Sequence, residues 1–144
     1  MTGASQGNGS SEDDAAALSA SLAYLQTHAS QWGIRDAQKE FRLRQVVRDS
    51  LGQSHVRLDQ MYQRLQVFGQ QVIVHLDQSG TAHSVTGAYR AGIDISTQPA
   101  ISIQEARTSA QQHSPGPVDT TPEADLVVYP QGEDVRLVYR VVLR

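Results

Sequence analysis

The sequence predicts an α+β fold in which one helix covers an antiparallel β-meander and a smaller helix–hairpin unit follows. Three observations support this prediction. Apolar residues first recur at helical spacing, they then alternate with a period of two as far as residue 89, and a helical pattern with a strand pair begins again after residue 100. Strands joined by short connections form a meander, and a helix with one apolar face can cover it.

The first expected element is a helix that begins at Ser10 and Ser11. A serine hydroxyl can cap free backbone N–H groups, and the acidic residues 12–14 favour the positive end of the helix dipole. The helix should end near residues 28–31, with Gly33 as a left-handed residue just beyond it. Its polar face has almost no Lys or Arg, which favours packing on its own sheet over a membrane-surface role. The apolar face comprises Leu18, Leu22, Leu25 and Ala29.

Four strands are expected next, because apolar and polar residues alternate. The first begins at Phe41, places Val46 on the same face as Arg42 and Arg44, and ends at a turn over residues 49–52. The other three strands are expected at residues 55–62, 67–76 and 82–89. A hairpin turn at residues 77–80 should join the last two.

A second helix is expected from Ser102 to Gln112. Ser102 and Glu105 can each satisfy the other's free backbone N–H group, which is the capping-box pattern. A Ser-Pro-Gly-Pro segment at residues 114–117 should end this helix, because proline cannot continue it.

Two further strands are expected at residues 125–129 and 135–143, around a turn at residues 130–134. A helix and one hairpin are too small to form a separate core. We therefore expect this unit to lean on the first one or to continue beyond Arg144. The sequence stops within an apolar strand, which indicates that it is cut from a longer chain.

Composition excludes several classes of site. The 144 residues include no cysteine, so a disulfide scaffold, a thiolate zinc site, an iron–sulfur cluster and a cysteine nucleophile are ruled out. Twelve Lys and Arg against 15 Asp and Glu give a net charge of −3, so the basic footprint of a nucleic-acid binder is missing. Residues 1–11 lack the apolar core of a signal peptide, and no window has the ~20 apolar residues of a membrane span. The chain is either cytoplasmic or a piece without its leader.

No combination of residues forms a recognisable catalytic site. The spacing of a zinc-binding His-Glu-x-x-His helix is absent. His55 and His75 lie on different expected strands and can approach each other. Two interpretations stay open: a pair of metal ligands, or histidines that are hydrogen-bonded within a polar sheet face. Asp59 near Arg57 favours a solvated ion pair over acid–base chemistry. From the residues alone, the chain is a binding or interaction module.

The strand region contains a specific motif. It comprises a His-x-Arg strand with Gln and Tyr at fixed offsets, a Val-Phe-Gly entry to the next strand, an apolar run ending in His, a Gly turn and a final Val-x-Gly. Over about residues 15–90 the chain thereby resembles the fungalysin/thermolysin propeptide (FTP) domain. The family's usual Asn-Gly turn is missing after Tyr62, so we expect a looser or longer connection there. The matching positions are His55, Arg57, Gln60, Tyr62, Val67, Phe68, Gly69, His75, Gly80, Val85 and Gly87.

From residue 101 onward, the chain has a Ser-x-x-Glu-Ala helix start and a strand pair at residues 126–130 and 136–141. With these features it resembles the PepSY domain that follows in secreted zinc metallopeptidases of the thermolysin type, without its last strands. The two resemblances imply a cystatin-like or half-barrel propeptide fold. They also imply a disordered segment at residues 1–10, an FTP-like domain at residues 11–90, a linker at residues 91–100 and a partial PepSY-like unit at residues 101–144.

The resemblance implies a propeptide that is not itself an enzyme. It would act as intramolecular chaperone and inhibitor of the catalytic domain of a secreted zinc metalloendopeptidase, with no nucleic-acid or membrane partner. This segment would hold no cofactor, and zinc and calcium would belong to the downstream domain. The signal peptide would lie outside this sequence. Two alternatives stay open: a stand-alone module that inhibits a peptidase in trans or binds another ligand, and an enzyme that uses His55 and His75.

The motif residues are the candidates for contact with the partner. They also have a structural interpretation: the glycines serve turns and bulges, Phe68, Val72, Val74 and Val85 are core positions, and the polar residues hold the sheet together. The candidate interface residues are His55, Arg57, Gln60, Tyr62, Phe68, Gly69, His75, Gly80 and Gly87.

Overall fold

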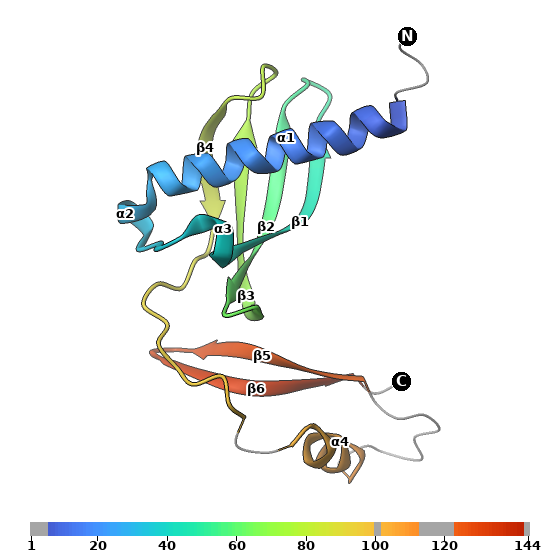
Figure 1. Cartoon of the computed structure of the whole chain (residues 1–144), viewed down its shortest axis with the longest axis vertical. Coiled ribbons are helices and arrows are strands. Elements are labelled where there is room, and N and C mark those ends of the chain that lie inside the picture. Colours follow the sequence, from blue (N-terminus) through green and yellow to red (C-terminus); the bar gives the residue numbers. More distant parts are fainter. Residues whose placement is uncertain (1–5, 100–101, 113–122, 143–144) are drawn as a thin grey trace. The chain divides into compact units, whose positions relative to one another are not determined.

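The computed structural model describes residues 6–99, 102–112 and 123–142. They form helices and a mostly antiparallel open sheet, which confirms the α+β class (Figure 1). The chain divides into two compact units. The first comprises the described residues up to Met61 together with Gln70–Gly92, and the second comprises Tyr62–Gly69 and the described residues from Ile93 onward.

The first unit contains the expected meander. Its strands are β1 (Phe41–Arg48), β2 (Ser54–Tyr62), β3 (Leu65–Leu76) and β4 (Ala82–Gly87), and the last residue of β2 and the first residues of β3 belong to the second unit. The strands follow one another in chain order, with β4 paired to β3. The β1–β2 and β3–β4 pairs are antiparallel.

Helix α1 (Gln6–Thr27) covers one face of this sheet (Figure 1). It begins four residues before Ser10, so the predicted start at Ser10 and Ser11 is wrong. Extending a packed helix by one residue is cheap compared with nucleating it, which lets the helix include two glycines. Residues 1–5 lie outside the described residues.

The predicted C-terminal end of the helical region is confirmed. A short helix α2 (Ala29–Trp32) follows α1, and Gly33 ends it in a left-handed conformation with φ of 79°. Helix α3 (Ala37–Glu40) comes next, and the Asp36 side chain caps it by accepting a hydrogen bond from the Gln38 backbone N–H at 3.1 Å.

The core of the first unit lies between α1 and the sheet. On α1 the buried positions are Ala17, Ser21 and Leu25, whereas Leu18 and Leu22 are only half-buried. The hydroxyl of Ser21 donates to the Ala17 carbonyl at 2.7 Å, which satisfies a polar group in an apolar layer. The other buried members of this core are Ile34, Ala37, Phe41, Val56, Leu58, Val72, Val74 and Leu76.

A β-bulge interrupts β1 between Leu43 and Gln45. The extra residue, Arg44, reverses the alternation that follows. Val46 therefore packs against the core, and Gln45 pairs with Arg57 of β2. The prediction that Val46 shares a face with Arg44 is wrong, because simple alternation cannot anticipate an inserted residue.

The connection between β2 and β3 is a two-residue turn. Gln63 and Arg64 have φ of 48° and 71°, and both left-handed values are typical of a type I′ hairpin. The predicted looser or longer connection is wrong. The twist of the flanking strands favours this tight geometry even without the Asn-Gly pair that suits it best.

The second unit contains β5 (Glu123–Gln131), β6 (Asp134–Val142) and α4 (Ile103–Gln112). The Ser102 hydroxyl accepts a hydrogen bond from the Glu105 N–H at 3.0 Å, as the capping pattern predicts. The predicted stop at residues 114–117 lies outside the described residues. Two strands are confirmed, but their turn is shorter than predicted, with Gln131 already paired to Asp134.

β5 and β6 form an antiparallel hairpin that also contacts α4. The start of β3 joins this unit through a parallel pairing of Val67 with Val128. The buried core here is small and comprises Val67, Ile93 and Val128, with Tyr62, Leu65, Ile95, Val135 and Leu137 packed against it.

Candidate functional site

The candidate site is the sheet face of the first unit that points away from the α1 core. Because successive strand residues point to opposite faces, the neighbours of core residues Val56, Leu58, Val72 and Val74 point outward. We call this set of side chains the outer face. It comprises His55, Arg57 and Asp59 on β2, Gln71, Ile73 and His75 on β3, and Thr86 on β4.

A hydrogen-bonded chain crosses the outer face. The Nδ1 atoms of His55 and His75 lie 2.7 Å apart. The Nε2 atom of His55 lies 2.9 Å from Oδ2 of Asp49, and Nε2 of His75 lies 2.9 Å from Oγ1 of Thr86. The predicted approach of the two histidines is confirmed, and every ring nitrogen in the pair has a polar partner.

The surroundings of the pair shift two titrations. Burial lowers the pKa of His75 below its ordinary value, and the charges of His55 and His83 act in the same direction. The hydrogen bond from His55 lowers the pKa of the Asp49 carboxyl, and the backbone N–H groups of Gln53 and Leu51 add to this effect. The neutral form of His75 and the ionised form of Asp49 are therefore favoured.

Two matching turns support this end of the sheet. In the β1–β2 turn, Oδ1 of Asp49 accepts from the N–H groups of Leu51 and Gln53, each at 3.0 Å. In the β3–β4 turn, Oδ1 of Asp77 accepts from the N–H groups of Ser79 at 2.9 Å and Thr81 at 3.0 Å. Both turns have glycine three residues after the aspartate, and this shared spacing is the sequence signal for the pair of turns.

The two turns also contact each other. The side-chain amide of Gln78 donates to the Leu51 carbonyl at 2.6 Å. The β1–β2 and β3–β4 turns, together with the His55–His75 pair, thus form one polar end of the unit.

Asp59 is the most buried acidic group of the outer face, with 3% exposure. Its carboxylate lies 3.2 Å from Arg44 Nη1 and 3.7 Å from Arg42 Nη2, and it accepts from Gln71 Nε2 at 3.3 Å. The predicted pairing with Arg57 is wrong, because the bulge brings Arg44 across the sheet instead. Arg57 is exposed, and its side chain makes no hydrogen bond or ion pair to the described residues.

Gln60 and Tyr62 hold main-chain segments. The buried Gln60 amide donates to the Arg90 carbonyl and accepts from the Arg90 N–H, both at 2.8 Å. The Tyr62 hydroxyl donates to the Ile95 carbonyl at 3.0 Å and accepts from its N–H at 3.1 Å. These paired bonds give both side chains a structural role.

Phe68 is 44% exposed and packs against Tyr129, with ring centroids 5.6 Å apart. The interpretation of Phe68 as a core residue is wrong, because Val67 takes the buried position and the next side chain points to the other face. Val72 and Val74 are buried, and Val85 is half-buried against the same core, as that interpretation requires.

Gly87 is required by both its backbone and its surroundings. Its φ is 114°, and a Cβ there would overlap the Gln71 carbonyl oxygen and lie 2.9 Å from the Val72 Cα. Gly69 also has a positive φ of 77°, but the space around it is open. The structural interpretation of the motif glycines is therefore strongest at Gly87.

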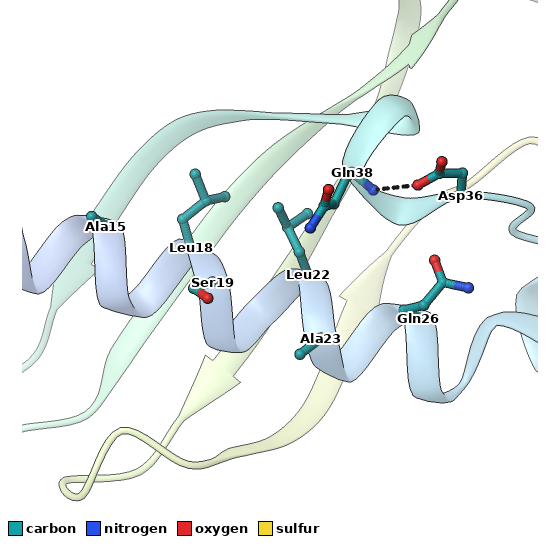
Figure 2. Close-up of a pocket in the computed structure, with 8 residues that line it drawn as sticks. All are labelled: Ala15, Leu18, Ser19, Leu22, Ala23, Gln26, Asp36 and Gln38. Atoms are coloured by element: carbon teal, nitrogen blue, oxygen red, sulfur yellow. Dashed lines mark hydrogen bonds between the residues drawn. The ribbon is translucent and has the colours of Figure 1, made fainter.

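A groove lies along α1, beside the short helix α3. Figure 2 shows the side chains of Leu18, Leu22, Gln26 and Gln38 around it, and its volume is about 590 Å³. The groove was not predicted, because Leu18 and Leu22 were assigned to the helix face that packs on the sheet.

No group of three His, Cys, Asp or Glu side chains within the described residues is arranged to hold a metal ion. His55 and His75 direct their nitrogens at each other and at hydrogen-bond partners rather than at a common point. No helix in the described part of the chain has the length and apolar character needed to cross a membrane.

Comparison with known families identifies the strand region. The sequence model of the Fungalysin/Thermolysin Propeptide Motif matches residues 39–89, which contain β1 to β4 and the whole outer face. The chain carries a thermolysin-type propeptide motif. The match confirms the resemblance over these residues, and the PepSY resemblance beyond it stays a prediction.

The curated proteins that are similar to this chain include thermolysins and a bacillolysin. Thermolysin of Alicyclobacillus acidocaldarius subsp. acidocaldarius is 34% identical over 106 residues, which are 67% of this chain and 19% of that protein. Thermolysin of Bacillus caldolyticus matches equally well, with 34% identity over 67% of this chain and 19% of that protein. Bacillolysin of Bacillus cereus is 29% identical over 77% of this chain and 21% of its own length. The chain spans about a fifth of the length of these curated relatives.

Proposed function

We propose that this chain is the propeptide segment of a secreted thermolysin-like zinc metalloendopeptidase, and that it acts as intramolecular chaperone and inhibitor of the cognate catalytic domain. The observation that carries the proposal is the propeptide motif at residues 39–89 in a chain related to thermolysins and a bacillolysin. The proposed roles need a surface that binds a partner and no catalytic group of its own.

The outer face supports this role. The sheet is rigidly built, because Asp59, Gln60 and the two aspartate turns fix its strands and connections. Arg57 lies exposed on this face and leaves its charge available to a carboxylate or carbonyl of the partner. We therefore assign Arg57 as the central contact of the interface.

Attachment to the catalytic domain would make a modest surface sufficient. Two linked segments meet at a high effective concentration, so they dock without tight intrinsic affinity. After processing this advantage is lost, and the propeptide can dissociate. Zinc and calcium would bind the catalytic domain.

The test is refolding of the cognate catalytic domain with and without this chain in trans. We expect the chain to raise the yield of active peptidase and to inhibit native peptidase when added in excess. Loss of the Arg57 charge, in Arg57→Glu, should weaken inhibition about tenfold or more, because a cation in the interface would become an anion.

Lys39→Glu is the matched control, since Lys39 is an exposed cation on α3 and lies off the outer face. It should inhibit like the unaltered chain. An unaltered chain that neither improves refolding nor inhibits its cognate peptidase would disprove the proposed function. Equal inhibition by Arg57→Glu and Lys39→Glu would remove Arg57 from the interface.

A further inference from the structure

The His55–His75 pair has an unusual constraint on its protons. The two rings face each other through the same atom, Nδ1, at 2.7 Å. A hydrogen bond between them needs one Nδ1 that carries a proton and one that accepts it. Both Nε2 atoms are engaged elsewhere, with Asp49 and with Thr86. The closed pair therefore has room for one proton between its two Nδ1 atoms.

Two protonation patterns satisfy every partner. In the neutral pattern, His55 donates through Nε2 to Asp49 and accepts at Nδ1 from His75, while the Thr86 hydroxyl donates to Nε2 of His75. In the singly charged pattern, His55 is an imidazolium that donates to both Asp49 and His75, and His75 donates through Nε2 to Thr86. A doubly charged pair would set two N–H groups against each other at 2.7 Å.

We propose that the His55–His75 pair is a proton-operated latch, in which uptake of the second proton from solvent breaks the Nδ1–Nδ1 hydrogen bond and loosens the end of the sheet formed by the β1–β2 and β3–β4 turns. The inference concerns this chain alone and stands whether or not the proposed propeptide function holds.

The charged groups around the His55–His75 pair favour a single positive charge on the pair and oppose a second one. The β1–β2 turn contributes the Asp49 carboxylate on the His55 side. The β3–β4 hairpin contributes His83, whose ring centroid lies 6.5 Å from that of His75, and Asp77, which interacts with His83. β2 adds the cation Arg57 two residues from His55 on the same face, and β1 presents the uncharged Val47 opposite His55. Within the described part of the chain, the only carboxylate bonded to the pair faces His55, which leaves a charge on His75 uncompensated.

The latch connects the parts that must move. His55 binds the first turn through Asp49, and His75 binds β4 through Thr86. Gln78 then joins the two turns through the Leu51 carbonyl. Separation of the rings therefore acts on both hairpins at this end of the unit.

The direction of the pH effect follows from the protons bound. The closed state holds fewer protons than the open state, in which His75 regains the ordinary histidine pKa of about 6.5. The latch is thus fully closed above that value and opens as the pH falls through the lowered pKa of His75. One extra proton in the open state raises the ratio of open to closed chains up to about tenfold per pH unit.

The experiment is an NMR titration of the ¹⁵N-labelled full chain from pH 8 to pH 4.5. We expect the histidine pair to titrate in two steps separated by more than about one pH unit, as strongly coupled groups do. The second step should coincide with shifts and faster hydrogen exchange in the amides of Leu51, Gln53, Ser79 and Thr81. Independent titration of both histidines near 6.5, without changes in these turns, would overturn the proposal.

Two variants separate the latch from a general acid effect. His75→Asn retains an acceptor but cannot take up the second proton, so its turn amides should show no second step between pH 7 and pH 5. His83→Gln removes the neighbouring histidine outside the bonded pair and should keep the response of the unaltered chain. A response in His75→Asn equal to that of the unaltered chain would also refute the latch. If His75→Asn does not fold, the titration of the unaltered chain decides alone.

Discussion

At the scale of single residues, several motif positions have structural tasks that sequence reasoning could only state in general terms. The proximity of His55 and His75 followed from strand alternation, because both were expected on the polar face of neighbouring strands. The partners of Asp59 and Gln60 did not follow from it. The Arg44 partner of Asp59 depends on a bulge, and Gln60 binds a backbone segment 30 residues later that has no regular structure. Such contacts have no sequence period.

Gly87→Ala should be strongly destabilising. The added Cβ would overlap the Gln71 carbonyl oxygen, and alanine at φ of 114° is strained in any surroundings. We expect a loss of about 3 kcal/mol or more in the free energy of unfolding, measured by urea denaturation. Gly69→Ala is the control, because its added Cβ meets open space. A smaller loss of unfolding free energy in Gly87→Ala than in Gly69→Ala would contradict the close approach of β4 to β3 at Gly87.

Arg64→Gly should stabilise the chain. Arg64 has φ of 71° in the two-residue turn, where glycine is unstrained, and type I′ turns prefer glycine at this second position. The gain should be about 0.5–1 kcal/mol, because relief of strain exceeds the added freedom of the unfolded chain. Urea denaturation measures it, and Arg136→Gly, in the interior of β6, should instead destabilise the chain.

At the scale of elements, alternation and turn residues predicted the number, order and pairing of the strands of the first unit. The predicted boundaries failed where neighbours outweighed local preference. The β2–β3 turn is tight although Gln-Arg is a poor type I′ pair, and α1 extends beyond its expected caps. The Ser102 cap succeeded because it depends only on residues within one helical turn.

The clamp between Gln60 and Arg90 should hold the segment after β4 in place. Gln60→Leu removes two hydrogen bonds and leaves the N–H and carbonyl of Arg90 without these partners. We expect a loss of about 2 kcal/mol and a selective rise in hydrogen exchange at the Arg90 amide. Gln45→Leu, an exposed position on β1, should leave that amide protected. Unchanged protection of Arg90 in Gln60→Leu would show that the clamp is dispensable.

At the scale of the whole molecule, the chain should be most stable in the pH range between the protonation of His75 and the deprotonation of Tyr89. On the acid side, the pKa of His75 is lowered in the folded chain. The contribution of His75 to the free energy of unfolding is therefore complete above about pH 6.5 and is lost as the pH falls below it. On the alkaline side, burial and the hydrogen bond to Glu40 raise the pKa of Tyr89 well above its ordinary value. Its contribution is present below about pH 10 and lost as the pH rises beyond it.

Thermal unfolding across pH 4 to pH 11 tests this window. Tyr89→Phe should unfold at a lower temperature than the unaltered chain at neutral pH, and the difference should shrink above about pH 10, because the unfolded tyrosine then ionises. Tyr129→Phe is the control, since Tyr129 is exposed in the second unit. A constant difference between Tyr89→Phe and the unaltered chain at all pH values would contradict the assigned role of Tyr89.

Because of the bulge, β1 contains one residue more than its pairing with β2 requires. Removal of Arg44 would join Leu43 directly to Gln45, and inward and outward positions on both sides would remain as they are. The shortened strand would lose the ion pair of Arg44 with Asp59 and keep its core. Removal of Gln45 would restore the same alternation through Arg44, whereas a deletion in the interior of β1 away from the bulge would reverse the faces of the residues on one side of it. Variation in chain length within this strand should therefore be tolerated best at the bulge, at Arg44 or Gln45.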